Sequence, residues 1–208
     1  MADRTRALWD KQRQAVGDRR QLFTAVADTV QAAAVLYPGS YVDVTPSSVW
    51  PAVTYVDLDR RAARFFGDVD GIGELLIQHG ADPSRHAVRF IHGDYREPLG
   101  LDEDSFDLLI SLYAGFVSEH CTPYLRVGGH LLVNASHGDA AMASIDHRYR
   151  LRAVVTSRDR TYRVTSRDLD SYLVPKRDVT VTRAHLHRTG RGIGYTKSPF
   201  AYLFERYR

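Results

Sequence analysis

Two stretches of the chain decide its class of fold: FDLLIS at 106–111 and YLRVGGHLLVN at 124–134. Each contains an apolar run whose length is typical of a strand buried in a sheet. Between them, residues 116–125 have the length of a short helix, and residues 126–129, with two glycines, predict a turn. A strand, a helix, a turn and a second strand in this order are typical of parallel sheets with helical crossovers.

The same alternation extends toward the N-terminus. Short apolar runs predict strands at 33–37, 53–56 and 88–92, and the segments between them predict helices at 59–66 and 72–79. Before these, residues 4–31 carry apolar side chains at helical spacing, with Gly17 and Asp18 as a break between two helices. The sequence therefore predicts an α/β fold with a doubly wound sheet that is preceded by N-terminal helices.

The C-terminal part has a different pattern. From Tyr149 onward β-branched and aromatic residues alternate with Arg and Thr, and an apolar run at 199–205 closes the chain. This alternation predicts antiparallel strands added to one edge of the sheet.

Composition and length narrow the class of protein. The chain has 208 residues, 44% of them hydrophobic and 25% charged, as in one soluble globular domain. No span approaches the ~20 apolar residues of a membrane helix, and the charged start MADRTRALWDKQR lacks the apolar stretch of a secretory signal. Cys121 is the single cysteine, which excludes an intramolecular disulfide and a zinc site built on paired cysteines. We expect a cytoplasmic protein with no membrane partner.

Charge is distributed unevenly along the chain. Residues 1–140 have a net charge of −6 and residues 141–208 a net charge of +9, giving +3 overall. This asymmetry indicates either a surface for an anionic partner or a solvated face of arginine-rich strands. Arg150, Arg152, Arg163 and Arg191 are the candidates for an anionic surface. Nucleic acid is not favoured as the partner, because the sequence shows no recognition helix.

The order of the elements resembles that of class I S-adenosylmethionine-dependent methyltransferases over residues 20–208. The strongest similarity lies in the two stretches quoted above, which look like the fourth strand of that family and the Gly-Gly entry into its fifth. Two acids add to it, since Asp57 ends the second predicted strand and Asp94 follows the third. The resemblance implies an enzyme that transfers a methyl group from S-adenosylmethionine to a small-molecule acceptor.

The resemblance also implies the organisation of the chain. It predicts a Rossmann-like, mostly parallel sheet of about seven strands with an antiparallel C-terminal edge. Residues 1–208 would form a single domain, with an N-terminal helical segment (1–31), a cofactor-binding half (32–140) and C-terminal strands (141–208). A homo-oligomer is compatible with the sequence, as is an anionic acceptor.

The expected cofactor site lies at the carboxyl ends of the strands, where open α/β sheets bind ligands. Asp57 can accept hydrogen bonds from both ribose hydroxyls, and Asp94 can accept one from the adenine amino group. The alternative for each acid is a turn residue or a helix N-cap. The full set of expected cofactor-binding residues is Tyr37, Gly39, Ser40, Asp57, Leu58, Asp94, Tyr95, Ser111 and Tyr113.

The first loop departs from the family pattern. The family has an acid and then glycines at alternate positions, whereas this chain has YPGSYVD at 37–43, in which only Gly39 matches. The loop therefore either holds the methionine end of the cofactor differently or has lost the ligand. The alternative function is an inactive methyltransferase-like binding or partner protein. A third is a Rossmann-like protein for another nucleotide, such as a nicotinamide cofactor.

A polar run, NASHGDA at 134–140, follows the fifth predicted strand. We expect His137 to face the acceptor as a general base or orienting group, because histidine titrates near neutrality. Asp139 is expected either to hold the His137 ring or, like Ser136, to cap the next helix.

Two further patterns carry weaker predictions. His185 and His187 would point the same way on a strand, but they have no third ligand nearby, so no metal is expected. The glycines at 190–194 lead into the terminal strand rather than into a helix. This predicts a hairpin or a loop over the site instead of a phosphate-binding turn.

Overall fold

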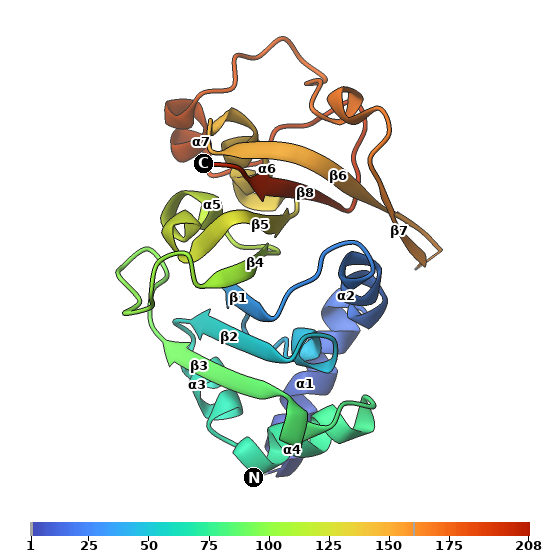
Figure 1. The fold of residues 1–208 in the computed structure, drawn as a ribbon, viewed down its shortest axis with the longest axis vertical. Coiled ribbons are helices and arrows are strands. Elements are labelled where there is room, and N and C mark those ends of the chain that lie inside the picture. Colours follow the sequence, from blue (N-terminus) through green and yellow to red (C-terminus); the bar gives the residue numbers. More distant parts are fainter. Residues whose placement is uncertain (1, 160) are drawn as a thin grey trace.

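The computed structural model describes residues 2–159 and 161–208 (Figure 1). Its helices are α1 (Ala2–Val16), α2 (Arg20–Ala27), α3 (Arg60–Phe66), α4 (Val69–Gln78), α5 (Val117–His120), α6 (Asp139–Ile145) and α7 (Arg183–Thr189). Its strands are β1 (Ala34–Pro38), β2 (Ala52–Asp57), β3 (Ala87–His92), β4 (Phe106–Ser111), β5 (Leu125–Val133), β6 (Tyr149–Arg158), β7 (Thr161–Thr165) and β8 (Ala201–Arg206).

In the described residues, eight strands form one sheet in the order β3-β2-β1-β4-β5-β8-β6-β7 (Figure 1). The strands from β3 to β5 are parallel, and β8, β6 and β7 add an antiparallel edge. The predicted Rossmann-like α/β sheet is confirmed, with one strand more than expected. The chain leaves β1 toward β2 on one side and returns to β4 on the other, so the strand order reverses between β1 and β4. Ligands of doubly wound sheets bind at such a reversal.

A hydrophobic core lies on each face of the sheet. Successive side chains of a strand point to opposite faces, so Val35 and Tyr37 belong to one core and Leu36 to the other. The first core is completed by α1 to α4, which contribute residues such as Trp9 and Phe65. The second is completed by α5, α6 and α7. β1, β2 and β4 are therefore covered on both faces, as their nearly continuous apolar sequences require. β3, at the edge of the sheet, is only partly buried.

The predicted turn at 126–129 lies inside β5. Phe106 of β4 pairs with Leu125, but Leu108 already pairs with His130, so the residues between are accommodated as an irregularity in β5. Gly129 is required there, because a Cβ would lie 2.8 Å from the backbone carbonyl oxygen of Arg126.

The helix predicted at 116–125 is much shorter in the structure. Phe116 adopts a left-handed backbone with φ of 57°, so α5 starts only at Val117. Pro123 lies in a separate 3₁₀ turn, Thr122–Tyr124, which leads directly into β5.

The strand predicted around His185 and His187 is wrong. Both residues lie in α7, whose first turn is capped by Thr182, since its Oγ1 accepts the backbone N–H of His185 at 3.1 Å. Gly190, with φ of 57°, ends the helix. The segment at 190–194 is irregular rather than a hairpin and passes over the 134–138 loop.

Among the described residues, none of the helices is both long and apolar enough to span a membrane. The same residues contain no cluster of three His, Cys, Asp or Glu side chains suited to a metal ion.

Candidate active site at the carboxyl ends of the parallel strands

The structure places all nine predicted cofactor-binding residues at or just after the carboxyl ends of β1, β2, β3 and β4. Four strand ends therefore converge on one edge of the sheet beside the reversal between β1 and β4. Their side chains differ in what they contact, and these contacts decide which of them a ligand can reach.

A buried polar network lies at the end of β1. Arg19, in the turn between α1 and α2, donates from Nη1 to the hydroxyl of Tyr37 at 2.9 Å and to Oδ2 of Asp43 at 2.8 Å. Arg19 and Asp43 are only 4% and 2% exposed. Burial raises the pKa of the Tyr37 hydroxyl, which stays protonated. Tyr37 is thus part of the protein interior, and the first loop is fixed from below by a buried ion pair.

Gly39 and Ser40 bring the first loop against the chain that follows β4. Gly39 has φ of 66°, and a Cβ on it would lie 2.8 Å from Cβ of Ala114. Ser40 is buried as well. The backbone of the first loop therefore packs closely against Ala114.

Asp57, at the end of β2, holds the first loop in place. Its Oδ2 accepts the backbone N–H of Tyr41 at 2.7 Å, and its Oδ1 accepts that of Asp59 at 2.8 Å. Each carboxylate oxygen has a second lone pair, so these bonds leave room for hydroxyl donors. Asp59 caps α3, since its side chain accepts the backbone N–H of Arg61.

Asp94, after β3, is chelated by Arg96. The Arg96 Nε and Nη2 atoms contact the two carboxylate oxygens at 2.5–2.9 Å, and its backbone N–H donates to Oδ1 at 2.9 Å. The hydrogen bond from the Arg96 side chain lowers the pKa of Asp94. Asp94 is therefore ionised at neutral pH, and Arg96 competes with a ligand for its oxygens.

A cavity of about 340 Å³ opens at this edge of the sheet. Its lining residues come from the segments after β2, β3, β4 and β5 and from the end of α7: Leu58, Asp94, Tyr95, Arg96, Gly115, Phe116, His137 and Gly190. Leu58 is 56% exposed, and the Tyr95 hydroxyl donates to the carbonyl of Gly115 at 2.9 Å. The structure thus brings the predicted catalytic His137 together with Leu58, Asp94 and Tyr95.

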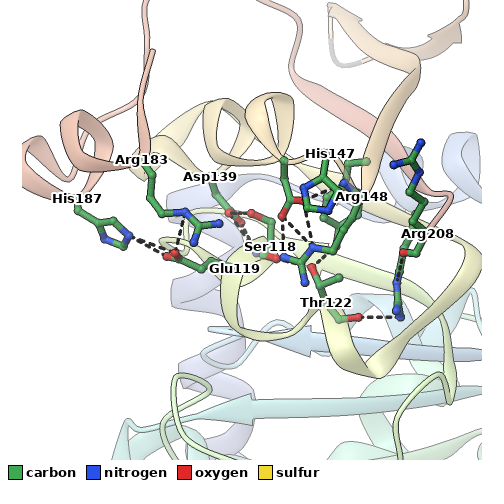
Figure 2. A network of polar contacts seen from close by, with 12 residues as sticks. Ser118, Glu119, Thr122, Asp139, His147, Arg148, Arg183, His187 and Arg208 are labelled. Carbon is green, nitrogen blue, oxygen red and sulfur yellow. Dashed lines mark hydrogen bonds and ion pairs between the residues drawn. The ribbon is translucent and has the colours of Figure 1, made fainter. Parts of the chain in front are cut away.

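The end of β4 is tied to α5 and α6 by a buried carboxylate (Figure 2). Asp139 is fully buried and accepts hydrogen bonds from Oγ of Ser111 and Oγ of Ser118, both at 2.5 Å. Burial raises its pKa. Both expectations for Asp139 are wrong, because it neither caps α6 nor contacts His137: the nearby hydroxyls draw the carboxylate inward. Ser136 does not cap α6 either, since Gly138 occupies the N-cap position.

Tyr113, two residues after the end of β4, is exposed to solvent. It has φ of 62°, and its backbone N–H donates to Oδ1 of Asn134 at 3.2 Å. The Arg19 guanidinium lies 5.1 Å from the centre of the Tyr113 ring, and Tyr113 is 51% exposed. Tyr113 therefore covers the buried Arg19 network and presents its outer side to solvent.

His137 is exposed and also has a left-handed backbone, with φ of 57°. Its Nδ1 lies 2.6 Å from Oγ of Ser136. The loop at 190–194 packs backbone to backbone against the loop that carries His137. Gly192 is required for this contact, because any side chain there would collide with the carbonyl oxygen of Ala135. The structure is thus consistent with the prediction that residues 190–194 form a loop over the site.

The helix before this loop is held on α5 by charge. Glu119 of α5 lies 3.3 Å from Nε of Arg183 and 3.0 Å from Nε2 of His187 (Figure 2). The His187 ring packs on Phe116, with 4.7 Å between ring centres. These contacts place Gly190 at the cavity.

Several site residues were not foreseen from the sequence. Arg19 lies next to a predicted helix break and carries no local signal of a tertiary partner. Arg96 belongs to an Asp-x-Arg turn that also occurs at Asp59 and Asp146, with the same bidentate contact. That repeated spacing was a readable signal for Arg96.

No family model matches the sequence, and no curated protein is similar to it. Solved structures are similar to its fold. A Klebsiella pneumoniae protein described as a candidate O-methyltransferase shares 16% identity, over 78% of this chain and 86% of that one, with a TM-score of 0.50. A Geobacter sulfurreducens methyltransferase shares 19% identity, over 73% of this chain and 84% of that one, with a TM-score of 0.49. From the strand order, the cavity at the strand ends and the first of these similarities, we conclude that the chain has the fold of the class I S-adenosylmethionine-dependent methyltransferases.

Proposed function

We propose that this protein transfers a methyl group from S-adenosylmethionine to a small-molecule acceptor. The observation that carries the proposal is the cavity in which Leu58, Asp94 and His137 meet from the ends of three different strands. Apolar, acidic and titratable groups in one concave site at a strand reversal are what a nucleoside cofactor and its reaction need.

The residues present fit an adenosine. Asp57 has lone pairs open to the ribose hydroxyls, and Asp94 offers a carboxylate to the adenine amino group once Arg96 yields one oxygen. Leu58 and Phe116 supply apolar surface for the base. When bound, the cofactor supplies an activated methyl group on its sulfonium.

The protein's part in such a reaction is to position the acceptor and to remove its proton. His137 lines the cavity, and its Nδ1 is already engaged by Ser136. Nε2 is then the ring nitrogen that takes a proton from an acceptor hydroxyl or amine. The 190–194 loop packs against the 134–138 loop, which carries His137.

The test is calorimetric titration with S-adenosylmethionine and with its demethylated product. We expect both to bind, and Asp57→Asn to weaken binding about 10- to 100-fold, because a charge-assisted hydrogen bond contributes about 1.5–3 kcal/mol. Asp82→Asn is the matched control: it changes an acid that caps the 3₁₀ turn Pro83–Arg85 before β3, away from the carboxyl ends of the strands, and it should leave the affinity unchanged. Equal affinity of wild type and Asp57→Asn, with both folded by circular dichroism, would remove Asp57 from the site.

One observation favours an inactive binding protein as the second candidate. The Tyr37 hydroxyl and the Asp94 carboxylate, two of the expected cofactor contacts, are already bonded to Arg19 and Arg96. Binding of the demethylated product without release of a labelled methyl group to any acceptor in a broad panel would favour this candidate. Transfer to one acceptor would exclude it.

A further inference from the structure

A second cavity, of about 680 Å³, lies between α1 and α3, away from the strand ends. We name it the α1–α3 groove. Its lining residues are Arg4, Thr5, Ala7, Leu8 and Lys11 of α1, Arg61, Arg64 and Phe65 of α3, and Gly67 and Asp68 after it. None of them lines the candidate active site.

The groove exists because α1 packs on α4 rather than on α3. Thr5 donates from Oγ1 to Oδ2 of Asp68, the N-cap of α4, at 2.5 Å. The Trp9 ring contacts His79, the C-cap of α4, edge-on, with 5.6 Å between ring centres. These two contacts tie one side of α1 to the beginning and the end of α4. The side that faces α3 is left open.

The floor of the groove is apolar and its rim is cationic. Ala7, Leu8 and Phe65 are its apolar lining residues, and we call them the floor and the four cations the rim; most of the lining surface is apolar. Arg4, Lys11, Arg61 and Arg64 stand around it.

The rim charges are not neutralised by the groove's own acid. Asp68, the only acid that lines the groove among the described residues, is engaged by Thr5 and by the backbone N–H of Gly71. Arg61 is paired with Asp59 at 2.6 Å. Arg4, Lys11 and Arg64 form no ion pair with any residue that the structure describes.

We propose that the α1–α3 groove binds a small amphipathic anion, with an apolar body and a terminal carboxylate, sulfonate or phosphate. The apolar body would cover Ala7, Leu8 and Phe65, and the anionic group would lie between Lys11 and Arg64. The volume is within the range of about 300–1,000 Å³ that is usual for small-molecule pockets. A concave site of this kind suits a free small molecule better than a membrane surface. The proposal is independent of methyl transfer.

The experiment uses the full chain and the fluorescent sulfonate 1-anilinonaphthalene-8-sulfonate as the probe, displaced by decanoate or by decanol. We expect saturable binding to one site and at least tenfold better displacement by decanoate, because decanol has the same chain length but no charge. Lys11→Gln/Arg64→Gln should weaken probe binding at least tenfold. The matched control, Arg85→Gln/Arg89→Gln, removes two exposed cations elsewhere and should change nothing.

A third variant separates the groove from general surface charge. Ala7→Trp keeps every cation and fills the floor at an exposed helix position, so it should abolish probe binding without altering the urea unfolding midpoint. The proposal is overturned if decanol displaces as well as decanoate, if both double variants lose affinity equally, or if Ala7→Trp binds like wild type. It is also overturned if the chain binds vesicles of anionic phospholipid but not free decanoate.

Discussion

At the residue scale, the most informative feature is a group of residues with left-handed backbone conformations beside the candidate active site. Tyr41, Tyr113, Phe116 and His137 have φ between 48° and 62°, a region that residues other than glycine rarely occupy. Each follows the end of a parallel strand. Strained conformations persist where the surroundings fix them, and they are often found at ligand sites.

This geometry decides which variant tests His137. Alanine would be strained at φ of 57°, whereas asparagine tolerates that conformation. We expect His137→Asn to keep the stability and the cofactor affinity while methyl transfer falls about 10²–10⁴-fold, the usual contribution of a general base. The measurement is turnover with an acceptor found by labelled methyl transfer, together with calorimetry. Turnover at the wild-type rate would show that His137 has no catalytic role.

The buried pair of Arg19 and Asp43 makes a second prediction at this scale. Removing one partner leaves the other charge buried, which costs about 3–5 kcal/mol. Arg19→Met should therefore lower the free energy of unfolding by that amount in urea titrations. Arg19→Met/Asp43→Leu should recover part of the loss, because no unpaired charge then remains. A single variant as stable as wild type would contradict the network.

At the element scale, the strands were predictable and several helices were not. Apolar runs predict β1, β2 and β4, which are buried on both faces. β3 is only partly buried, but Val88, Phe90 and Ile91 still form an apolar run. The short α5 escaped prediction because the left-handed Phe116 and the 3₁₀ turn at Pro123 divide an apparently helical stretch. Helix α7 was not predicted, because the period-two spacing of its histidines is typical of a strand. Its Thr182 N-cap and the Gly190 that ends it are typical of a helix.

The site was predictable as a set of strand ends but not as a set of contacts. A strand end follows from local sequence, and so does the acid placed there. The bond from Arg19 to Tyr37 spans 18 residues, and that from Ser111 to Asp139 spans 28. Such pairs depend on how helices pack on the sheet, which local patterns do not report. For this reason the sequence predicts that Asp139 holds the His137 ring or caps α6, and it does not show the bonds to Ser111 and Ser118.

The junction of α6 and β6 makes a prediction about pH. Burial opposes the ionisation of Asp146, but hydrogen bonds from Arg148 outweigh it and lower the pKa of the carboxyl. Folding therefore favours the ionised form, so this stabilisation is present above the usual Asp pKa of about 4 and is lost as pH falls through the lowered value. Arg148→Gln should cost about 1–3 kcal/mol at pH 7.

The pH dependence is the check on this assignment. The difference in unfolding free energy between wild type and Arg148→Gln should shrink steadily below pH 4, as Asp146 becomes protonated in both proteins. Urea titrations at pH 7, 5, 4 and 3 measure it. A difference that stays constant over this range would mean that the contact does not act through the charge of Asp146.

At the scale of the whole molecule, the arginines of the positively charged C-terminal part, residues 141–208, differ in what they contact. Arg150 lies over the Tyr207 ring, 4.7 Å from its centre, and Arg152 pairs with Glu205 at 3.1 Å. Both lie on β6, beyond β8 from the parallel strands. Arg191 is different, since its carbonyl lies against Gly138, next to His137.

If the acceptor is anionic, we expect Arg191 to attract it, because the Arg191 backbone lies beside the loop that carries His137. We expect kcat/KM to fall as salt rises from 50 to about 500 mM, because ions screen the attraction beyond about 10 Å. Arg191→Gln should flatten this dependence, and Arg150→Gln should not. Wild-type kinetics that do not change with salt would assign the positive charge to solvated surface.

Arg61 contacts both the α1–α3 groove and the first loop. It lines the α1–α3 groove, chelates Asp59 at the start of α3 and lies 5.1 Å from the centre of the Tyr41 ring in the first loop. Tyr41 is in turn bonded to Asp57. If an anion in the groove draws Arg61 away from Tyr41, the first loop loses a contact next to Asp57, the proposed ribose ligand. Thermodynamic linkage then requires reciprocity: the factor by which decanoate changes the affinity for the adenosine ligand equals the factor by which that ligand changes the affinity for decanoate.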